Sequence, residues 1–218
     1  MGEEFYSEEA KNSDEVYEIL KKKIIRMEFP PGQVLNEVDL ANQYKMSRTP
    51  IRKILSLLHS DKLIVIIPRF GAQVAPIDFM YMKSVFEVTR VLDPMAAKLA
   101  ADRLTEDQIQ ELEEIVERLD KYSIKDDYQV AIDDDAKFHA LVYSNCGNVC
   151  IQKYLQELHC HTERLWHYSE QHIPTMDISR GTLEKVLTAI KAKDYDAIEI
   201  YSREHIDAFV NHTKQRLL

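Results

Sequence analysis

The chain has 218 residues, enough for one large domain or two modest ones, and its formal net charge at pH 7 is −9. Hydrophobic residues make up 45% of it and charged residues 30%, a composition that is typical of folded globular proteins and excludes a disordered chain. No run of about 18 apolar residues occurs, so no membrane span is predicted, and the acidic N-terminus does not resemble a secretory signal. Three cysteines without a CxxC motif (Cys146, Cys150 and Cys160) favour a reduced, cytoplasmic setting.

The charge is distributed unevenly along the chain. Residues 14–75 contain ten Lys and Arg against seven Asp and Glu, an excess of +3, whereas residues 76–218 contain seventeen against twenty-six, a net −9. The first thirteen residues contribute the remaining −3. This asymmetry indicates that a partner with negative charge, such as nucleic acid, would bind the N-terminal part.

The N-terminal part predicts three short helices. The first runs from its N-cap Asp14 to about Met27, where apolar residues recur at helical spacing, and the FPPG sequence at 29–32 ends it. Asn36 caps a second, short helix, and Ser47 caps a third.

Two strands are predicted after the third helix. Residues 63–67 and 72–75 are rich in β-branched and small apolar residues, and they flank a tight connection at 68–71. This pair of strands predicts a hairpin wing. Helix, turn, basic helix and wing, in that order, form the arrangement that places one helix in the DNA major groove.

From Asp78 onward the pattern is entirely helical. We expect helices at about 78–102, 105–122, 126–145, 148–171, 177–192 and 194–216. Only Gly147 and Gly181 are glycines between residues 76 and 218, which suits a helical bundle and excludes a Gly-rich phosphate cradle. The predicted fold is therefore mainly α: a winged helix-turn-helix at 10–76 and an all-α helical bundle at 77–218.

The third predicted helix carries the candidate DNA-binding residues. Arg48 and Arg52 lie at i and i+4, so both guanidinium groups project from one helix face, where they suit guanine edges or phosphates. Ser47 and Thr49 add hydroxyls at a helix N-terminus, where a phosphate binds readily. The alternative is an ordinary solvated basic face, but the cap, the preceding helix and the wing together favour DNA binding.

The wing supplies a second candidate contact with DNA. Arg69 lies at its tip beside Gly71, where its side chain would reach a minor groove or a phosphate.

These residues resemble a known family. The string PGQVLNEVDLANQYKMSRTPIRKILSLLHSDKLI, followed by PRFGAQV, resembles the winged helix-turn-helix of GntR-type bacterial transcription regulators over residues 14–75. The part beginning VFEVTRVLDPMAAKLAA is similar to the FCD-type ligand-binding domain of the fatty-acid-regulator branch, over most of 78–215. The resemblance implies that Arg48, Thr49 and Arg52 contact DNA and that Gly71 is the wing glycine. Val38 stands where the family often has a basic residue.

A candidate metal site lies in the helical part. Asp135 and His139 are one turn apart on a predicted helix, and His205 lies on the last helix, so the three could converge on zinc or nickel. Taken alone, an Asp and a His one turn apart are more often a surface pair. The FCD resemblance implies a site made of an Asp, a His four residues later and two further histidines, and these three residues match it. The fourth position is Leu183, which cannot bind a metal, so either water or effector completes the shell or the site is lost.

The effector-binding residues are less evident. The FCD family commonly has Glu-x-Arg in the first helix of this domain, whereas here Glu87 and Arg90 are separated by two residues, which turns the arginine by about 100°. If no metal binds, Arg90, His161 and Arg164 are the candidates for effector recognition. His159, His161 and His167, with two aromatic residues nearby, either line the bundle or take part in a pocket.

Two functions are compatible with these patterns. The first is a DNA-binding transcription regulator, a repressor in most family members, that binds a pseudo-palindromic operator as a homodimer under the control of a small-molecule effector. The second is a metal-dependent helical-bundle enzyme with an N-terminal DNA-binding or targeting domain. The first is favoured, because no HExxH motif, no Gly-rich loop and no readable Ser-His-Asp arrangement occurs.

Overall fold

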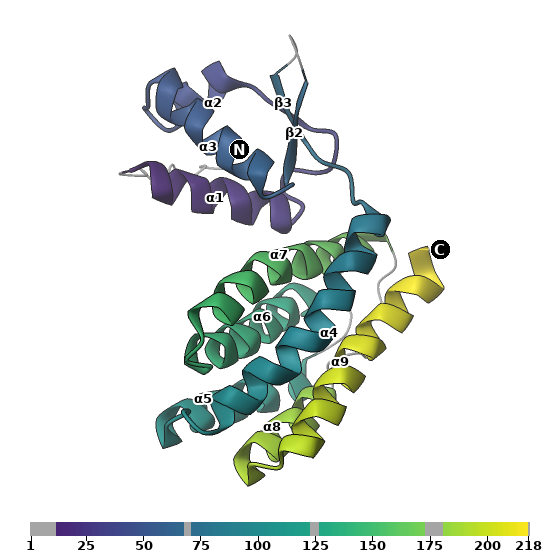
Figure 1. Ribbon diagram of the computed structural model, residues 1–218. Helices are drawn as coiled ribbons and strands as arrows, with labels where there is room; N and C mark the ends of the chain where they lie inside the picture. Colours follow the sequence, from purple (N-terminus) through teal and green to yellow (C-terminus); the bar gives the residue numbers. More distant parts are fainter. Residues whose placement is uncertain (1–11, 68–70, 123–126, 173–180, 218) are drawn as a thin grey trace. The chain divides into compact units, whose positions relative to one another are not determined.

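The computed structural model describes residues 12–67, 71–122, 127–172 and 181–217. The chain divides into two compact units, Met1–Ile77 and Asp78–Leu218. Figure 1 shows an N-terminal unit with three helices and a small sheet and a C-terminal unit made of helices. The predicted fold class, mainly α with a small β-wing, is confirmed.

The N-terminal unit is a winged helix-turn-helix. Its elements are α1 (Ser13–Ile25), β1 (Val34–Leu35), α2 (Glu37–Gln43), α3 (Arg48–Ser60), β2 (Ile64–Ile67) and β3 (Gly71–Val74). Its core is formed by the apolar faces of the helices, which their helical spacing in the sequence also indicates. The fully buried members include Val16, Leu20, Ile24, Ile51 and Leu58. A separate core of this size allows the unit to hold α3 rigidly.

The first helix begins earlier than predicted. Asn12, not Asp14, is the N-cap, because its side-chain oxygen accepts the backbone N–H groups of Asp14 and Glu15. Asn36 caps α2 in the predicted way. Ser47 occupies the N-cap position of α3 but makes no side-chain capping bond, which leaves its hydroxyl available at that helix end.

The sheet has a third strand that the sequence did not predict. The strand order is β1-β3-β2, all antiparallel, with Leu35 opposite Ala72 and Ile64 opposite Val74. At two residues, β1 is too short to show a period-2 pattern. Gly71 begins β3 with φ +100°, a conformation that suits glycine and closes the wing. Arg69 lies outside the described residues.

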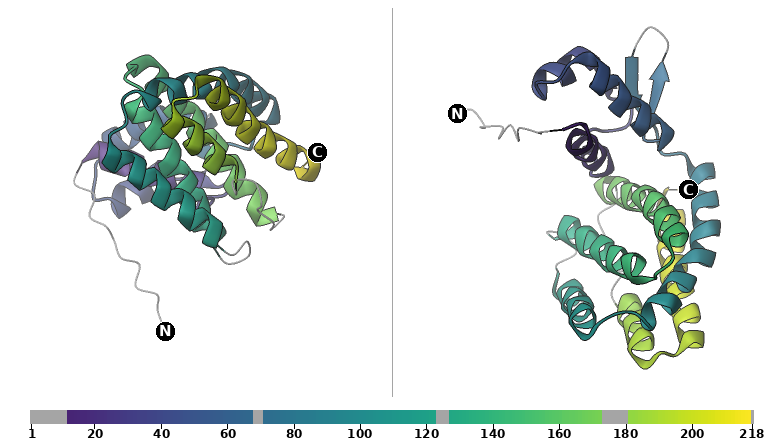
Figure 2. Two further views of the ribbon diagram at one scale, coloured as in Figure 1. Left: turned by 90° about the horizontal axis from the view of Figure 1, so that it is seen from below. Right: turned by 60° about the vertical axis from the view of Figure 1, so that its left-hand side comes forward.

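Six helices form the C-terminal unit over its described residues. They are α4 (Phe79–Ala101), α5 (Glu106–Lys121), α6 (Tyr128–Asn145), α7 (Val149–His172), α8 (Thr182–Ala192) and α9 (Tyr195–Leu217). Helix α4 packs against α9, α7 and α6, while α8 packs against α9 and α5 (Figures 1 and 2). No helix in the described part of the chain is long and apolar enough to cross a membrane.

The ends of these helices follow local signals in the sequence. Thr105 and Gln108 form the capping box that starts α5, and Gly147, with φ +68°, lies just beyond the end of α6. The predicted helix at 177–192 is observed from Thr182, and residues 177–180 lie outside the described residues.

A buried carboxylate joins α5 to α6. Asp134 is 1% exposed, and its Oδ2 accepts hydrogen bonds from Arg118 Nε and the Tyr122 hydroxyl, each at 2.8 Å. Its Oδ1 accepts one from Lys137 Nζ at 2.8 Å. Burial by itself would raise the pKa of Asp134, but these donors outweigh it and lower the pKa from 3.8 to about 2. Ionised Asp134 therefore stabilises the fold.

The depressed pKa of Asp134 predicts acid-dependent stability. Because the folded pKa lies below the unfolded one, the contribution is fully present above about pH 4 and is lost as the pH falls towards 2. We expect a loss of about 1–2 kcal/mol, since Arg118 and Lys137 are partly solvated. Urea unfolding at several pH values measures it. Asp134→Asn should flatten this part of the pH dependence, and Asp120→Asn, an exposed carboxylate on α5, should not.

Candidate DNA-reading helix and buried histidine cluster

The N-terminal turn of α3 presents the predicted DNA-binding residues to solvent. Ser47, Arg48, Thr49 and Arg52 are all exposed, and the side chains of the two arginines are 58% and 62% exposed. The buried side of the same helix packs into the core. Helix α3 therefore has the two-faced character of a recognition helix.

A carboxylate on α2 holds both arginines. Glu37 Oε2 accepts from Arg48 Nη2 at 3.0 Å and from Arg52 Nε at 2.8 Å. The bond from Arg52, with the bond from Arg48 and the charges of both, lowers the pKa of Glu37. Exposed ion pairs add little to stability, so this pairing mainly orients the two guanidinium groups.

Sequence reasoning missed Glu37. The contact spans 11 and 15 residues across the turn between α2 and α3, which no helical period relates. A signal was present, because an acidic residue opens α2 directly after its cap while a basic pair opens the next helix. Val38, beside Glu37, is 46% exposed and supplies no basic contact.

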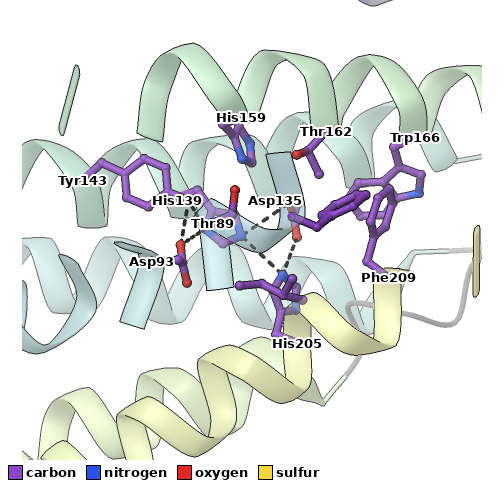
Figure 3. Close-up of a pocket in the computed structure, with 12 residues that line it drawn as sticks. Thr89, Asp93, Asp135, His139, Tyr143, His159, Thr162, Trp166, His205 and Phe209 are labelled. Atoms are coloured by element: carbon purple, nitrogen blue, oxygen red, sulfur yellow. Dashed lines mark hydrogen bonds and ion pairs between the residues drawn. The ribbon is translucent and has the colours of Figure 1, made fainter. Parts of the chain in front are cut away.

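The C-terminal unit contains a pocket between four of its helices (Figure 3). Side chains from α4, α6, α7 and α9 line it, with polar groups gathered on one side and aromatic rings on the other. The lining residues are Phe86, Thr89, Asp93, Asp135, His139, Tyr143, His159, Thr162, Trp166, His205, Ile206 and Phe209. The free space is about 40 Å³, room for an ion and a few waters.

The structure brings the three predicted metal ligands together. His139 Nε2 and His205 Nε2 are 3.3 Å apart, although the residues are 66 positions apart in sequence. Asp135 Oδ2 lies 3.7 Å from His139 Nε2, and Asp135 Oδ1 lies 3.7 Å from His205 Nε2. All three side chains are buried, so they are not the surface pair that local spacing alone would suggest.

Neighbouring groups engage the outer nitrogen of each imidazole. Nδ1 of His139 lies 3.2 Å from the Tyr143 hydroxyl, which donates to Asp93 Oδ1 at 2.6 Å. Nδ1 of His205 lies 2.8 Å from Thr182 Oγ1 on α8. These contacts hold each ring with Nε2 facing into the pocket. Metal-binding imidazoles in proteins are oriented in the same way, by a hydrogen bond on the nitrogen that does not bind the metal.

Burial dominates the protonation of this cluster. It raises the pKa of Asp135 to about 6 and lowers the pKa of His205 to about 3. Burial also lowers the pKa of His159 to about 3. For His139, burial is outweighed by the charge of Asp135 and by the contact with Asp93, so its pKa is raised. The cluster thus holds imidazole lone pairs close to a carboxylate.

The donor set fits a divalent transition metal. Two nitrogens bound to zinc at about 2.0–2.1 Å with a tetrahedral angle lie about 3.3 Å apart, which matches the separation of His139 and His205. Two imidazoles and a carboxylate are also ordinary ligands for zinc and nickel. Three donors leave a position open, because Leu183 is buried on α8 and does not line the pocket.

The residues predicted to bind the effector lie elsewhere. Arg90 projects from α4 and pairs with Asp207 on α9 at 2.9 Å. His161 is buried with its ring against Tyr81, at 5.1 Å between centroids, and Arg164 is buried on α7. None of the three predicted residues lines the pocket. Burial lowers the pKa of Arg164 to about 10.

The histidine-rich stretch of α7 divides between its faces. His159 and Trp166 line the pocket, whereas His167 lies near Glu163, 3.9 Å from its Oε1, outside the pocket. With Asp133, these last two form another group of possible metal donors among the described residues. Asp93 and Tyr143 were missed from the sequence. The signal for Asp93 was an acidic residue within the apolar run VLDPMAA.

Two family models match the chain, one over each of its units. The family model "Bacterial regulatory proteins, gntR family" matches residues 12–74, and the FCD domain model matches residues 84–208. The chain is 25% identical over 205 residues to the HTH-type transcriptional regulator YdhC of Bacillus subtilis, covering 92% of this chain and 88% of that protein. It is 21% identical over 207 residues to the transcriptional repressor RspR of Escherichia coli, covering 93% and 89%.

Solved structures share the fold. Escherichia coli McbR/YncC superimposes with a TM-score of 0.80 at 23% identity, over 94% of this chain and 98% of that one. A regulator from Rhodococcus gives 0.76 at 17% identity, over 95% and 98%. The family and its members are transcription regulators, so the alternative of a metal-dependent enzyme is set aside. The chain belongs to the GntR family of bacterial transcription regulators, in the group whose helical part is an FCD domain.

Proposed function

We propose that this protein represses transcription by binding a pseudo-palindromic operator as a homodimer, and that a small molecule in the FCD domain controls its affinity for DNA. The observation that carries the proposal is the exposed arginine pair of α3, oriented by Glu37. The similarity to RspR, which is named a repressor, favours repression over activation.

Base reading would rest on Arg48 and Arg52. A guanidinium group donates two parallel hydrogen bonds to guanine O6 and N7, or clamps a phosphate. Glu37 would hold both groups ready in the free protein, and DNA acceptors would then compete with its carboxylate. Ser47 and Thr49 would contact phosphate at the α3 N-terminus, and Arg69 and Gly71 of the wing are proposed as further DNA contacts.

Dimerisation would supply the second recognition helix. One helix reads too few base pairs for useful specificity, so a two-fold dimer on a two-fold operator is expected. Helix α4 offers a surface for it: Val88, Val91 and Met95 follow one face at helical spacing and are 45%, 61% and 50% exposed.

The pocket would bind the regulatory ligands. Asp135, His139 and His205 would hold a divalent metal such as zinc or nickel, which supplies a fixed positive charge in the bundle. The aromatic wall formed by Trp166 and Phe209, with rings 5.5 Å apart, would contact the effector. The free space of about 40 Å³ takes an ion and a few waters, so we expect these aromatic side chains to move when a larger effector binds.

Arginine removal tests DNA reading. Arg48→Ala and Arg52→Ala should each weaken binding to a selected operator by about 1–3 kcal/mol and relax specificity at one position per half-site, because a bidentate base contact is lost. Lys22→Ala on α1 is the matched loss of an exposed positive charge and should have a smaller effect. Fluorescence anisotropy on cognate and scrambled duplexes measures both. Unchanged affinity in both arginine variants would refute the assignment.

Charge placed on α4 tests the dimer. The double variant Val91→Glu/Met95→Glu should shift the protein from dimer to monomer at micromolar concentration, because two charges would be buried in an apolar contact. Val149→Glu, at a residue 78% exposed on α7, is the control. Sedimentation velocity reads the mass. A monomeric wild type contradicts the dimer, and a dimeric double variant contradicts the surface.

Metal titration tests the cluster. Chelated full-length protein should bind one equivalent of zinc or nickel, and His205→Ala should weaken binding at least tenfold, because one of three donors is lost. His161→Ala removes another buried imidazole of the same domain, outside the pocket, and should leave the affinity unchanged. Calorimetry gives the affinities. A wild type that binds no metal would contradict the proposed metal site, and the effector would then bind without an ion.

A further inference from the structure

His159 faces the pocket from α7, opposite the three metal donors of the proposed function. Together with Thr162 and Trp166 it follows one face of the helix at helical spacing, and all three line the pocket. Figure 3 shows its imidazole directed from α7 toward His139. The centroids of these two rings are 4.9 Å apart, with the planes at 45°. This geometry places a fourth possible donor beside the cluster.

Three buried polar atoms of pocket-lining residues make no hydrogen bond within the described residues: Trp166 Nε1, which can only donate, and His159 Nε2 and Asp135 Oδ1, which can accept. A buried polar atom without a partner is costly, so such atoms indicate a missing ligand or water. His159 Nε2 and Asp135 Oδ1 can both offer a lone pair, and they are not bonded to each other. A metal cation bound between them would satisfy both at once.

Helix α8 does not provide this donor. Leu183, at the position where the family resemblance implies the fourth ligand, is 1% exposed and packs in the bundle. The Thr182 hydroxyl of α8 contacts the outer nitrogen of His205, which does not face the other donors. A fourth protein donor must therefore come from another helix, and α7 carries an imidazole facing the pocket.

We propose that His159 is the fourth protein ligand, so that Asp135, His139, His159 and His205 hold a divalent metal from α6, α7 and α9. This inference rests on the proposed metal site. The other three donors lie within 4.8 Å of one another, and His159 lies beyond that group. Binding therefore requires the His159 imidazole to come closer to the other three donors than it lies in this structure. His159 on α7 thereby takes the place of the ligand that the family resemblance implies at position 183 on α8.

Zinc affinity and the cobalt spectrum test the proposal in full-length protein freed of metal by chelation. His159→Ala should weaken zinc binding about tenfold or more. Removing a residue that only hydrogen-bonds to a metal ligand already lowers metal affinity about tenfold, and loss of a ligand should cost at least as much. Two controls on the same helix should bind as the wild type does: Thr162→Ala, on the same face without a nitrogen, and His161→Ala, an imidazole away from the pocket. Thermal unfolding checks that each variant is folded.

His159→Cys gives a direct spectroscopic signature. A thiolate bound to Co²⁺ produces a sulfur-to-metal charge-transfer absorption in the near-ultraviolet, which the wild type with its three native cysteines controls for. The proposal predicts this absorption in the variant and its absence in the wild type. It also predicts that the His159→Cys variant keeps much of the zinc affinity that His159→Ala loses.

The outcomes separate this proposal from the one it rests on. If His205→Ala loses zinc while His159→Ala does not, the metal site has three protein ligands and His159 is left to contact the effector. Absence of the charge-transfer absorption in a folded, cobalt-loaded His159→Cys variant likewise overturns the proposal. If the wild type binds neither zinc nor cobalt, both this inference and the proposed metal site fall.

Discussion

Burying the two carboxylates of the pocket inside a bundle of helices is the constraint on which the C-terminal unit depends. Asp93 and Asp135 are 5% and 4% exposed, so each must be compensated by neighbours from other helices. Asp93 receives the Tyr143 hydroxyl and lies beside His139, and its pKa is lowered even though burial opposes this. No such hydrogen bond to Asp135 is present in the part of the chain that the structure describes, and burial raises its pKa to about 6. Helices α4, α6 and α9 must therefore stay packed so that the compensating groups remain close to the two carboxylates. This packing forms the pocket.

The N-terminal unit handles charge in the opposite way. Glu37 and its two arginines lie at the surface, where an ion pair contributes at most about 1 kcal/mol to stability. Such a pair is easily exchanged for other partners, which suits residues proposed to meet DNA. The buried carboxylates require the neighbouring helices to pack in one arrangement. The exposed Glu37 orients its two arginine side chains but leaves them able to exchange partners. The two units therefore use charge for different purposes.

Helix α7 shows what the sequence pattern of a helix predicts and what only its packing decides. Its histidines and aromatic residues read from the sequence as one polar-aromatic cluster. In the structure, one face presents His159, Thr162 and Trp166 to the pocket, while His161 contacts Tyr81 on α4. The second half of α7 buries polar residues, His161, Arg164 and His167, together with apolar ones, so an apolar stripe does not identify the face toward the pocket. Only contact with α4, α6 and α9 selects which imidazole faces the pocket.

The sequence by itself determined the helices, the two wing strands and their order, since caps, prolines, glycines and helical spacing act within a few residues, whereas the two-residue strand β1 carries no such signal. It also placed Arg48 with Arg52, and Asp135 with His139, because one turn separates each pair. The tertiary structure decided what these pairs meet: Glu37 across the turn, and His205 from the last helix. It placed Arg90, His161 and Arg164 outside the pocket. Those outcomes depend on how distant helices pack, and no local hydrogen bond or period encodes that packing.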